Sequence, residues 1–406
     1  MKRPFLTVLG LLCLIISCSK QSSVNLADKD RIQPYAKNPR YWQYKGDPVL
    51  LLGITYEDWL QIPDPEPRLA ALKNAGGNFV ECFLFPADKN KINPFIVHDR
   101  SGLFSGQMNT LFWDRLQSFL LKTAKMDIVV QLHILPGKQS VTENDISDEN
   151  WIYNYADTLL SRTLLFGHIL YDINPGSSVP CEQSVHWIDV MKTRASERHA
   201  HIVVSVEPRD RYNNISASDS GETKSLLSFF THPKYNSLSG QAYWDAFQKL
   251  RDQTSENPIP IISSGSKGPD KFARFWQNIL GGMAAVLYEE NPDSIFGSTA
   301  LASLKSARML QEKLDIFNSS PEKMDQLSRR KPDEAYMTCI LNKQYALFFP
   351  REGSVDLDLK NMTGIFEYRW LDIMKSEWRN PMQMPGGGIS RTITPGPGPW
   401  ITLYSK

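Results

Sequence analysis

Acidic side chains follow several apolar runs of the chain, and these are the residues whose types and positions could do chemistry. Glu57 and Asp58 come after one run, Glu207 closes a second, and Glu289 follows a third. Two carboxyl groups can divide acid and base work between them when burial raises the pKa of one. We predict Glu207, paired with Glu289 or Asp58, as the catalytic candidates. A solvated loop charge is the alternative for each acid taken singly.

Polar and aromatic side chains stand at the ends of the same runs, where a bound substrate could meet them. Glu57 and Trp59 follow the first run, His133 stands near the end of DIVVQLHIL, and Asn174 precedes Pro-Gly. We predict these four residues as substrate contacts. For His133 the alternative is a histidine whose hydrogen bonds are satisfied within the core or at its rim.

Glu81 is an acid inside an apolar run. A buried carboxylate must find a partner or take up a proton. We therefore predict a structural ion pair between Glu81 and an arginine. Its neighbour Cys82 is predicted as a small core residue.

The elements that must position these residues alternate between short apolar runs and amphipathic segments of helical length. The predicted strands cover 49–54, 78–85, 127–135, 168–174, 201–207, 235–242, 259–263 and 283–288. The run 235–242 is the weakest of them because of its Ser and Gly content. Repeated strand–helix units predict an α/β fold, a (β/α)8 TIM barrel over 33–317, with its chemistry at the carboxyl ends of the strands.

The pattern changes after a polar linker at 318–332. From 333 to 406 short strands follow one another, with turn residues but no helices between them. This spacing predicts a small antiparallel β-sandwich. A unit of this length can bury only a modest core, so we expect it to pack on the barrel.

The N-terminal residues are typical of a targeting segment rather than of a folded element. Basic residues precede an apolar stretch, and Ile-Ile-Ser-Cys18 resembles a bacterial lipobox. We predict a lipoprotein signal peptide at 1–18, a lipid on Cys18 and a tether at 19–32. The expected location is the cell envelope, at the periplasmic or surface face of the outer membrane. An ordinary signal peptide or a signal anchor is the alternative.

The composition argues against several classes of function. The formal net charge is +1, so we expect no nucleic acid partner and no membrane contact apart from the lipid. Cys82, Cys181 and Cys339 are widely spaced and indicate neither a disulfide framework nor a metal knuckle. The sequence has no phosphate-binding loop and no Gly-X-Ser-X-Gly motif. We expect a monomer that needs no metal and no cofactor.

Three stretches resemble secreted glycoside-hydrolase-like barrels of the clan A type that end in a module named for collagen binding. NPRYWQYKGDPVLLLG, at 38–53, is similar to their opening hairpin and first strand. ARFWQNILGGMAAVLY, at 273–288, is similar to the segment that leads into their eighth strand. The tail, with QYALFFPREGSVDLDL, FEYRWLDIMKSEW and PGPGPWITLY, resembles the C-terminal module. The resemblance covers most of the mature chain.

The resemblance implies cleavage of glycosidic bonds by a Glu at the end of strand four and a carboxylate at the end of strand seven. In such retaining chemistry one carboxyl group is protonated while the other is ionised, with about 5–5.5 Å between them. Here strand four ends in Asn174-Pro175 and strand seven in Ser263-Ser264-Gly265. Both expected catalytic positions lack a carboxylate.

A shifted register would restore one of these positions. Val206-Glu207-Pro208 resembles the Asn-Glu-Pro that often closes strand four, which would make Glu207 the acid. The run 168–174 would then be a strand too many, and this counts against the shifted register.

We therefore expect a glycoside-hydrolase-like protein that acts on a polysaccharide or oligosaccharide at the cell envelope. The alternative is a non-catalytic carbohydrate-binding surface lipoprotein, in which the barrel is kept for its groove and its aromatic residues. Adhesion to host matrix through the sandwich is a third class, and it rests on the name of the module alone.

Overall fold

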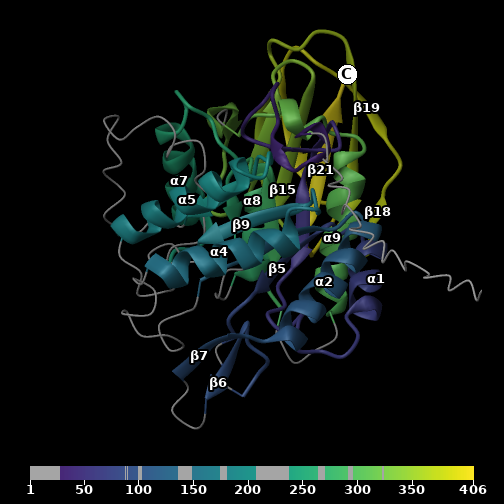
Figure 1. Cartoon of the computed structure of the whole chain (residues 1–406). Coiled ribbons are helices and arrows are strands. Elements are labelled where there is room, and N and C mark those ends of the chain that lie inside the picture. Colours follow the sequence, from purple (N-terminus) through teal and green to yellow (C-terminus); the bar gives the residue numbers. More distant parts are fainter. Residues whose placement is uncertain are drawn as a thin grey trace, which may run out of the picture.

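A computed structural model of the chain describes residues 28–86, 88, 90–98, 103–135, 149–173, 181–206, 237–263, 270–290, 296–321 and 324–406. Within these residues, a curled parallel sheet with helices around it is followed by antiparallel sheets (Figure 1). The fold class predicted from the sequence, a barrel of the TIM type with a C-terminal antiparallel unit, is confirmed.

The parallel sheet contains seven strands in the order β10-β9-β8-β5-β4-β12-β11. In chain order they are β4 (Leu51–Ile54), β5 (Phe79–Phe83), β8 (Val129–His133), β9 (Ile169–Ile173), β10 (Val204–Val206), β11 (Ile262–Ser263) and β12 (Ala285–Tyr288). They match predicted strands one to five, seven and eight. The first strand pairs directly with the eighth, so the sheet curls round on itself as a half-barrel. Most of these residues are buried on both faces, as expected for a parallel sheet between side-chain layers.

The predicted strand at 235–242 is wrong over its described part. Residues 237–239 are turn and coil, and α7 (Gly240–Gln253) begins at Gly240. The Ser and Gly that weakened the strand prediction suit the start of a helix. Ser239 occupies the N-cap position, and Gly240 has a φ of 56°, which favours glycine.

Helices cover the outer face of the parallel sheet. Besides α7 they are α1 (Glu66–Asn74), α2 (Thr110–Lys125), α4 (Glu149–Thr163), α5 (Cys181–Ser196), α8 (Lys271–Leu280) and α9 (Ser298–Gln311). Each turns an apolar side inward, as Leu116 and Phe119 do on α2. None of the described helices is both long and apolar enough to cross a bilayer.

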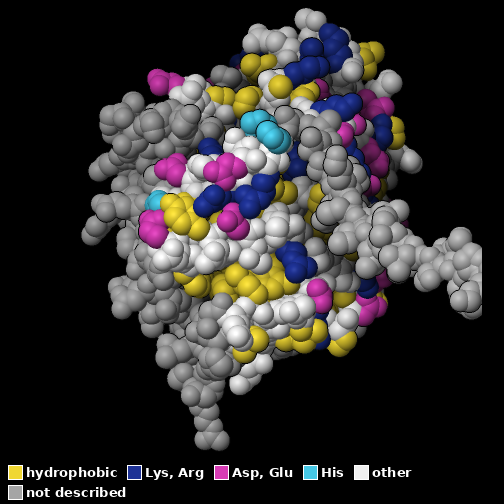
Figure 2. Space-filling view, viewed as in Figure 1, with side chains coloured by type: hydrophobic (Ala, Val, Ile, Leu, Met, Phe, Trp, Pro, Cys, Tyr) yellow, Lys and Arg dark blue, Asp and Glu magenta, His cyan; other side chains and the backbone are white. Residues whose placement is uncertain are grey.

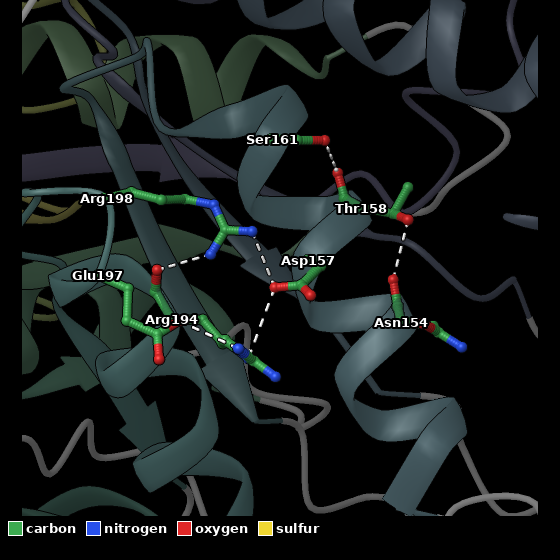
Figure 3. A network of polar contacts seen from close by, with 7 residues as sticks. All are labelled: Asn154, Asp157, Thr158, Ser161, Arg194, Glu197 and Arg198. Carbon is green, nitrogen blue, oxygen red and sulfur yellow. Dashed lines mark hydrogen bonds and ion pairs between the residues drawn. The ribbon is translucent and has the colours of Figure 1, made fainter.

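A network of surface ion pairs joins α4 to the C-terminal end of α5 (Figure 3). The Asp157 carboxylate accepts a hydrogen bond from Arg198 Nη2 at 2.9 Å and lies 3.6 Å from Arg194 Nε. Arg194 also binds Glu197 at 3.0 Å. Because these side chains are partly exposed, each pair contributes about 1 kcal/mol or less. Figure 2 shows the same mixing of charge over these helices, without a field of one sign.

A small antiparallel sheet covers the amino-terminal end of the barrel. It consists of β1 (Gln33–Pro34), β2 (Trp42–Tyr44) and β3 (Asp47–Val49). The chain just before it is fixed to the turn that leads into β9, because Ile32 N donates to Gly167 O at 2.7 Å. At the other end of the barrel, β6 (Phe95–His98) and β7 (Leu103–Met108) form a separate hairpin after β5.

The C-terminal unit consists of two antiparallel sheets. One contains β13 (Leu327–Ser328), β16 (Ser354–Asp358) and β20 (Ile389–Ile393). The other contains β14 (Tyr336–Ile340), β15 (Gln344–Phe349), β17 (Ile365–Asp372), β18 (Glu377–Trp378), β19 (Met382–Pro385) and β21 (Trp400–Ser405). Its residues between the sheets form a core of their own, which includes Phe349, Trp370 and Trp400.

The C-terminal unit packs on the barrel, as its short length predicted. The ring centroid of Phe348 lies 5.9 Å from that of Trp276 on α8, and the ring centroid of Tyr336 lies 5.1 Å from that of Trp244 on α7. Phe348 and Tyr336 therefore belong to the same hydrophobic cluster as the barrel core. The two units share one apolar interior along this contact, while the domain boundaries stay predictions.

Candidate functional site

Titratable side chains gather on the inner face of the parallel sheet, close to the carboxyl ends of its strands. We call this end of the barrel the mouth. Residues opposite each other in parallel strands point to the same side of the sheet. Glu81 lies opposite Gln131, His133 opposite Asp172, and Asp172 opposite Ser205. The other side belongs to the helices, because Tyr171 next to Asp172 shares a hydrogen bond with Thr163 of α4. The acids and the histidine thus face the barrel interior.

His133 lies between two carboxyl groups. Its Nδ1 is 2.6 Å from Asp172 Oδ2, and its Nε2 is 3.5 Å from Glu81 Oε1. Ser205 Oγ donates to the other oxygen of Asp172 at 2.8 Å. The imidazole also stacks on the ring of Phe83, with 4.1 Å between ring centroids. The three titratable groups form a line from β5 across β8 to β9, which we call the Glu81–His133–Asp172 line.

The three side chains of this line are buried, which strengthens the electrostatic interactions between them. Glu81 is 4%, His133 3% and Asp172 0% exposed. Burial alone would lower the pKa of His133, but the charge and hydrogen bond of Asp172, together with Glu81, raise it to about 10. Burial also raises the pKa of Glu81, and this outweighs the opposing effect of His133. At neutral pH His133 is therefore an imidazolium, stabilised mainly by Asp172, rather than a free base.

The sequence predicted that Glu81 pairs with an arginine, and this partner is wrong. The described partner of Glu81 is His133, from the neighbouring strand. The two residues stand 52 positions apart in the sequence, so only the strand register brings them together. Asp172 and Ser205 were missed altogether as site residues. The signal was present in HILYDINPG, where Asp172 stands two residues before the predicted contact Asn174.

The described end of predicted strand seven faces away from the mouth. Ser263 Oγ accepts a hydrogen bond from Asn278 Nδ2 of α8 at 2.9 Å, and the Asn278 oxygen accepts one from Tyr243 at 2.6 Å. Ser263 is therefore a helix-facing residue, 1% exposed. Ser264 and Gly265, the rest of that strand end, lie outside the described residues.

The three predicted site residues after β4 have different surroundings. Glu57 is exposed, and its charge contributes to the raised pKa of Glu81 after burial and Asp172. Asp58 is held by Lys91 Nζ, which lies 2.6 Å from its carboxylate. Trp59 is 1% exposed and packs 5.0 Å from Tyr56 between ring centroids. This burial gives Trp59 a packing role in the core.

Glu289 directly follows β12 and is half-buried. It stands two residues beyond Leu287, whose side chain lies against Gly53 inside the barrel. The alternation of β12, continued one step past the end of the strand, predicts that Glu289 faces the mouth. The next residue, Glu290, donates its backbone N–H to Thr55 Oγ1 at 3.0 Å, which ties this exit to that of β4. The predicted residues Glu207, Asn174 and Cys18 lie outside the described part of the chain.

Solved structures share this architecture across almost the whole chain. A glycoside hydrolase has a TM-score of 0.69 and 12% identity, covering 93% of this chain and 97% of its own. A glycoside hydrolase family 5 protein from Bacteroides vulgatus has a TM-score of 0.71 and 14% identity, covering 93% and 94%. A maltogenic α-amylase from Thermotoga neapolitana has a TM-score of 0.55 and 11% identity, covering 88% and 99%. This chain has a glycoside-hydrolase-like fold.

Comparisons of sequence add no closer relative. No protein-family model matches the chain, and no curated protein matches it. Because the identities to the solved structures are low, the likeness establishes the fold and leaves the chemistry to the residues of this chain.

Asp172→Asn should lower the free energy of unfolding by about 3–5 kcal/mol, because it leaves the buried imidazolium of His133 without its nearest counter-charge. Asp157→Asn on the surface of α4 is the matched control, and we expect a loss of about 1 kcal/mol or less. Denaturant unfolding at pH 7 measures both. A loss for Asp172→Asn as small as that of the control would contradict the buried ion pair.

The pH dependence of stability should have opposite slopes on the two sides of pH 6.5, each caused by one buried histidine. The pKa of His133 is raised from 6.5 to about 10, so its contribution is complete below pH 6.5 and is lost as the pH rises toward 10. His168, which contacts Thr123 Oγ1 at 2.9 Å, has a pKa lowered by burial to about 4, so stability is lost as the pH falls from 6.5 toward 4. Nitrogen chemical shifts of the two imidazoles check this directly. If His133 titrated near pH 6.5, the line of charges would be refuted.

Proposed function

We propose that this protein is a glycoside-hydrolase-like protein that takes a polysaccharide or oligosaccharide at the mouth of its barrel. The observation that carries the proposal is the buried Glu81–His133–Asp172 line on the inner face at that end. Buried ion pairs add little to stability compared with apolar packing, whereas strongly shifted pKa values gather at functional sites. In barrels of this type the mouth is where ligands bind and react.

Hydrolysis of a glycosidic bond requires one protonated and one ionised carboxyl group across the scissile bond. Glu289 supports the proposal because it directly follows β12 and is predicted, from the alternation of that strand, to face the mouth. Glu207 supports it because it closes predicted strand five in the sequence. Asp58 is already bound by Lys91, so it would first have to leave this ion pair. We therefore propose Glu207 and Glu289 as the acid/base pair. The side chains of the Glu81–His133–Asp172 line then lie beneath the bound ligand.

A non-catalytic carbohydrate-binding protein is the second candidate, and two observations favour it. Ser263 on predicted strand seven is directed to α8 instead of the mouth. Asp172, the inward acid of predicted strand four, is fully buried and bound by both His133 and Ser205. Ser263 has no carboxyl group, and the carboxyl group of Asp172 is already bound. Neither side chain therefore supplies a second carboxylate opposite Glu289.

A panel of neutral and charged oligosaccharides separates the two candidates. If the protein is a hydrolase, Glu207→Gln and Glu289→Gln should each lower the rate about 10²- to 10⁴-fold while leaving affinity largely intact. Glu290→Gln is the matched control, because Glu290 uses its backbone N–H to hold Thr55. Saturable binding without turnover by the unaltered protein would favour the binding function. A protein that neither binds nor cleaves any member of the panel would contradict the proposal.

We further propose that a lipid on Cys18 holds the protein at the cell envelope. The lipobox-like Ile-Ile-Ser-Cys18 and the polar residues after it support this location. Cys18→Ser should move the protein from the membrane fraction to the soluble fraction and abolish incorporation of labelled fatty acid. Labelling that persists in Cys18→Ser would contradict the lipid site, and it would leave the glycan proposal untouched.

A further inference from the structure

Gln131 is a buried polar residue of the barrel interior that lies outside the Glu81–His133–Asp172 line. It lies in the middle of β8, two residues before His133 and directly opposite Glu81 of β5. Its side chain is 0% exposed. Within the described part of the chain, neither its Nε2 nor its Oε1 has a hydrogen-bond partner.

Such an amide is unusual inside a protein. The large majority of buried polar atoms are paired, either with protein groups or with ordered water. A water molecule fits a site that offers two to four polar partners. The two polar atoms of Gln131 and the carboxyl group opposite provide such a set.

Glu81 has unused hydrogen-bonding capacity on the same side. Its Oε1 is 3.5 Å from His133 Nε2, which is an ion pair rather than a well-formed hydrogen bond. The same oxygen is buried and has no hydrogen-bond partner among the described residues. A carboxyl oxygen and an amide thus face the interior from adjacent strands, and neither has a hydrogen-bond partner among the described residues.

We propose that Gln131 and Glu81 form an internal water site in the barrel, directly below His133. A bound water accepts from Gln131 Nε2 or donates to its Oε1, and it forms a second hydrogen bond with the Glu81 carboxyl group. The water pairs with the carboxyl group that lies 3.5 Å from His133, and it holds that group toward the imidazolium. Gln131 is then a positioning residue for the Glu81–His133–Asp172 line. The inference holds whichever glycan the protein takes.

The sign of a stability change tests the site. Gln131→Met keeps the length of the side chain and removes its polar atoms. If water pairs the amide, Gln131→Met should lower the melting temperature by at least about 2 °C, because the water and Glu81 lose a partner. If the amide is an orphan, the same change removes an unpaired polar group and should raise the melting temperature. That rise would overturn the proposal.

Thr402 in β21 supplies the matched control. Its Oγ1 is also buried without a partner in the described chain, but Leu347 and Trp370 lie opposite it instead of an acid. Thr402→Val should leave the melting temperature unchanged or raise it.

A second measurement covers the case in which Gln131→Met does not fold. A high-resolution crystal structure of the unaltered protein should show a water peak within hydrogen-bond distance of both the Gln131 amide and the Glu81 carboxyl group. A direct contact between these two side chains, or apolar packing around the amide without a peak, would refute the site.

Discussion

A buried charge must have a counter-charge beside it, and this constraint organises the interior of the barrel. His133 on β8 carries a positive charge, and the acids paired with it, Glu81 and Asp172, lie on β5 and β9. A slip of one residue in any of these strands would turn one charge toward the apolar helix layer. Desolvating an unpaired charge there costs several kcal/mol, so the ion pairs specify the register of three neighbouring strands. The same register places Ser205 of β10 against Asp172.

The two ends of the barrel are held by different kinds of interaction. At the amino-terminal end, Arg308 of α9 donates to Gly76 O, Leu50 O and Asn78 Oδ1, so one guanidinium joins a helix to the chain around the first two strands. This side chain binds oxygens that carry no full charge, and its burial lowers its pKa to about 10. At the mouth, His133 is buried between the carboxyl groups of Glu81 and Asp172. The first arrangement joins a helix to the strands, and the second lies at the end of the barrel that we propose as the ligand site.

The strands could be predicted from the sequence because each is a short apolar run, and the run 127–135 contains β8 whole. The predicted strand at 235–242 failed because Ser and Gly suit a helix start as well as a weak strand. The partner of Glu81 could not be predicted, since it depends on which residue of β8 lies near it in register. The direction of Ser263 depends in the same way on alternation along β11, a strand of two residues. Local pattern thus predicts elements, whereas the pairing of side chains needs the register between strands.

The position of Asp172 explains how an acid on the inner face of the barrel can be bound within the interior. Along β9 the inward positions alternate, so Asp172 occupies the inward position one step below the end of the strand. At that depth it is fully buried, and it binds His133 and Ser205 instead of meeting solvent. A carboxylate fixed in this way contributes field and shape to whatever lies above it, and it keeps its proton-accepting atoms occupied. The acid/base pair that we propose therefore lies beyond the strand ends, where Glu289 is only half-buried.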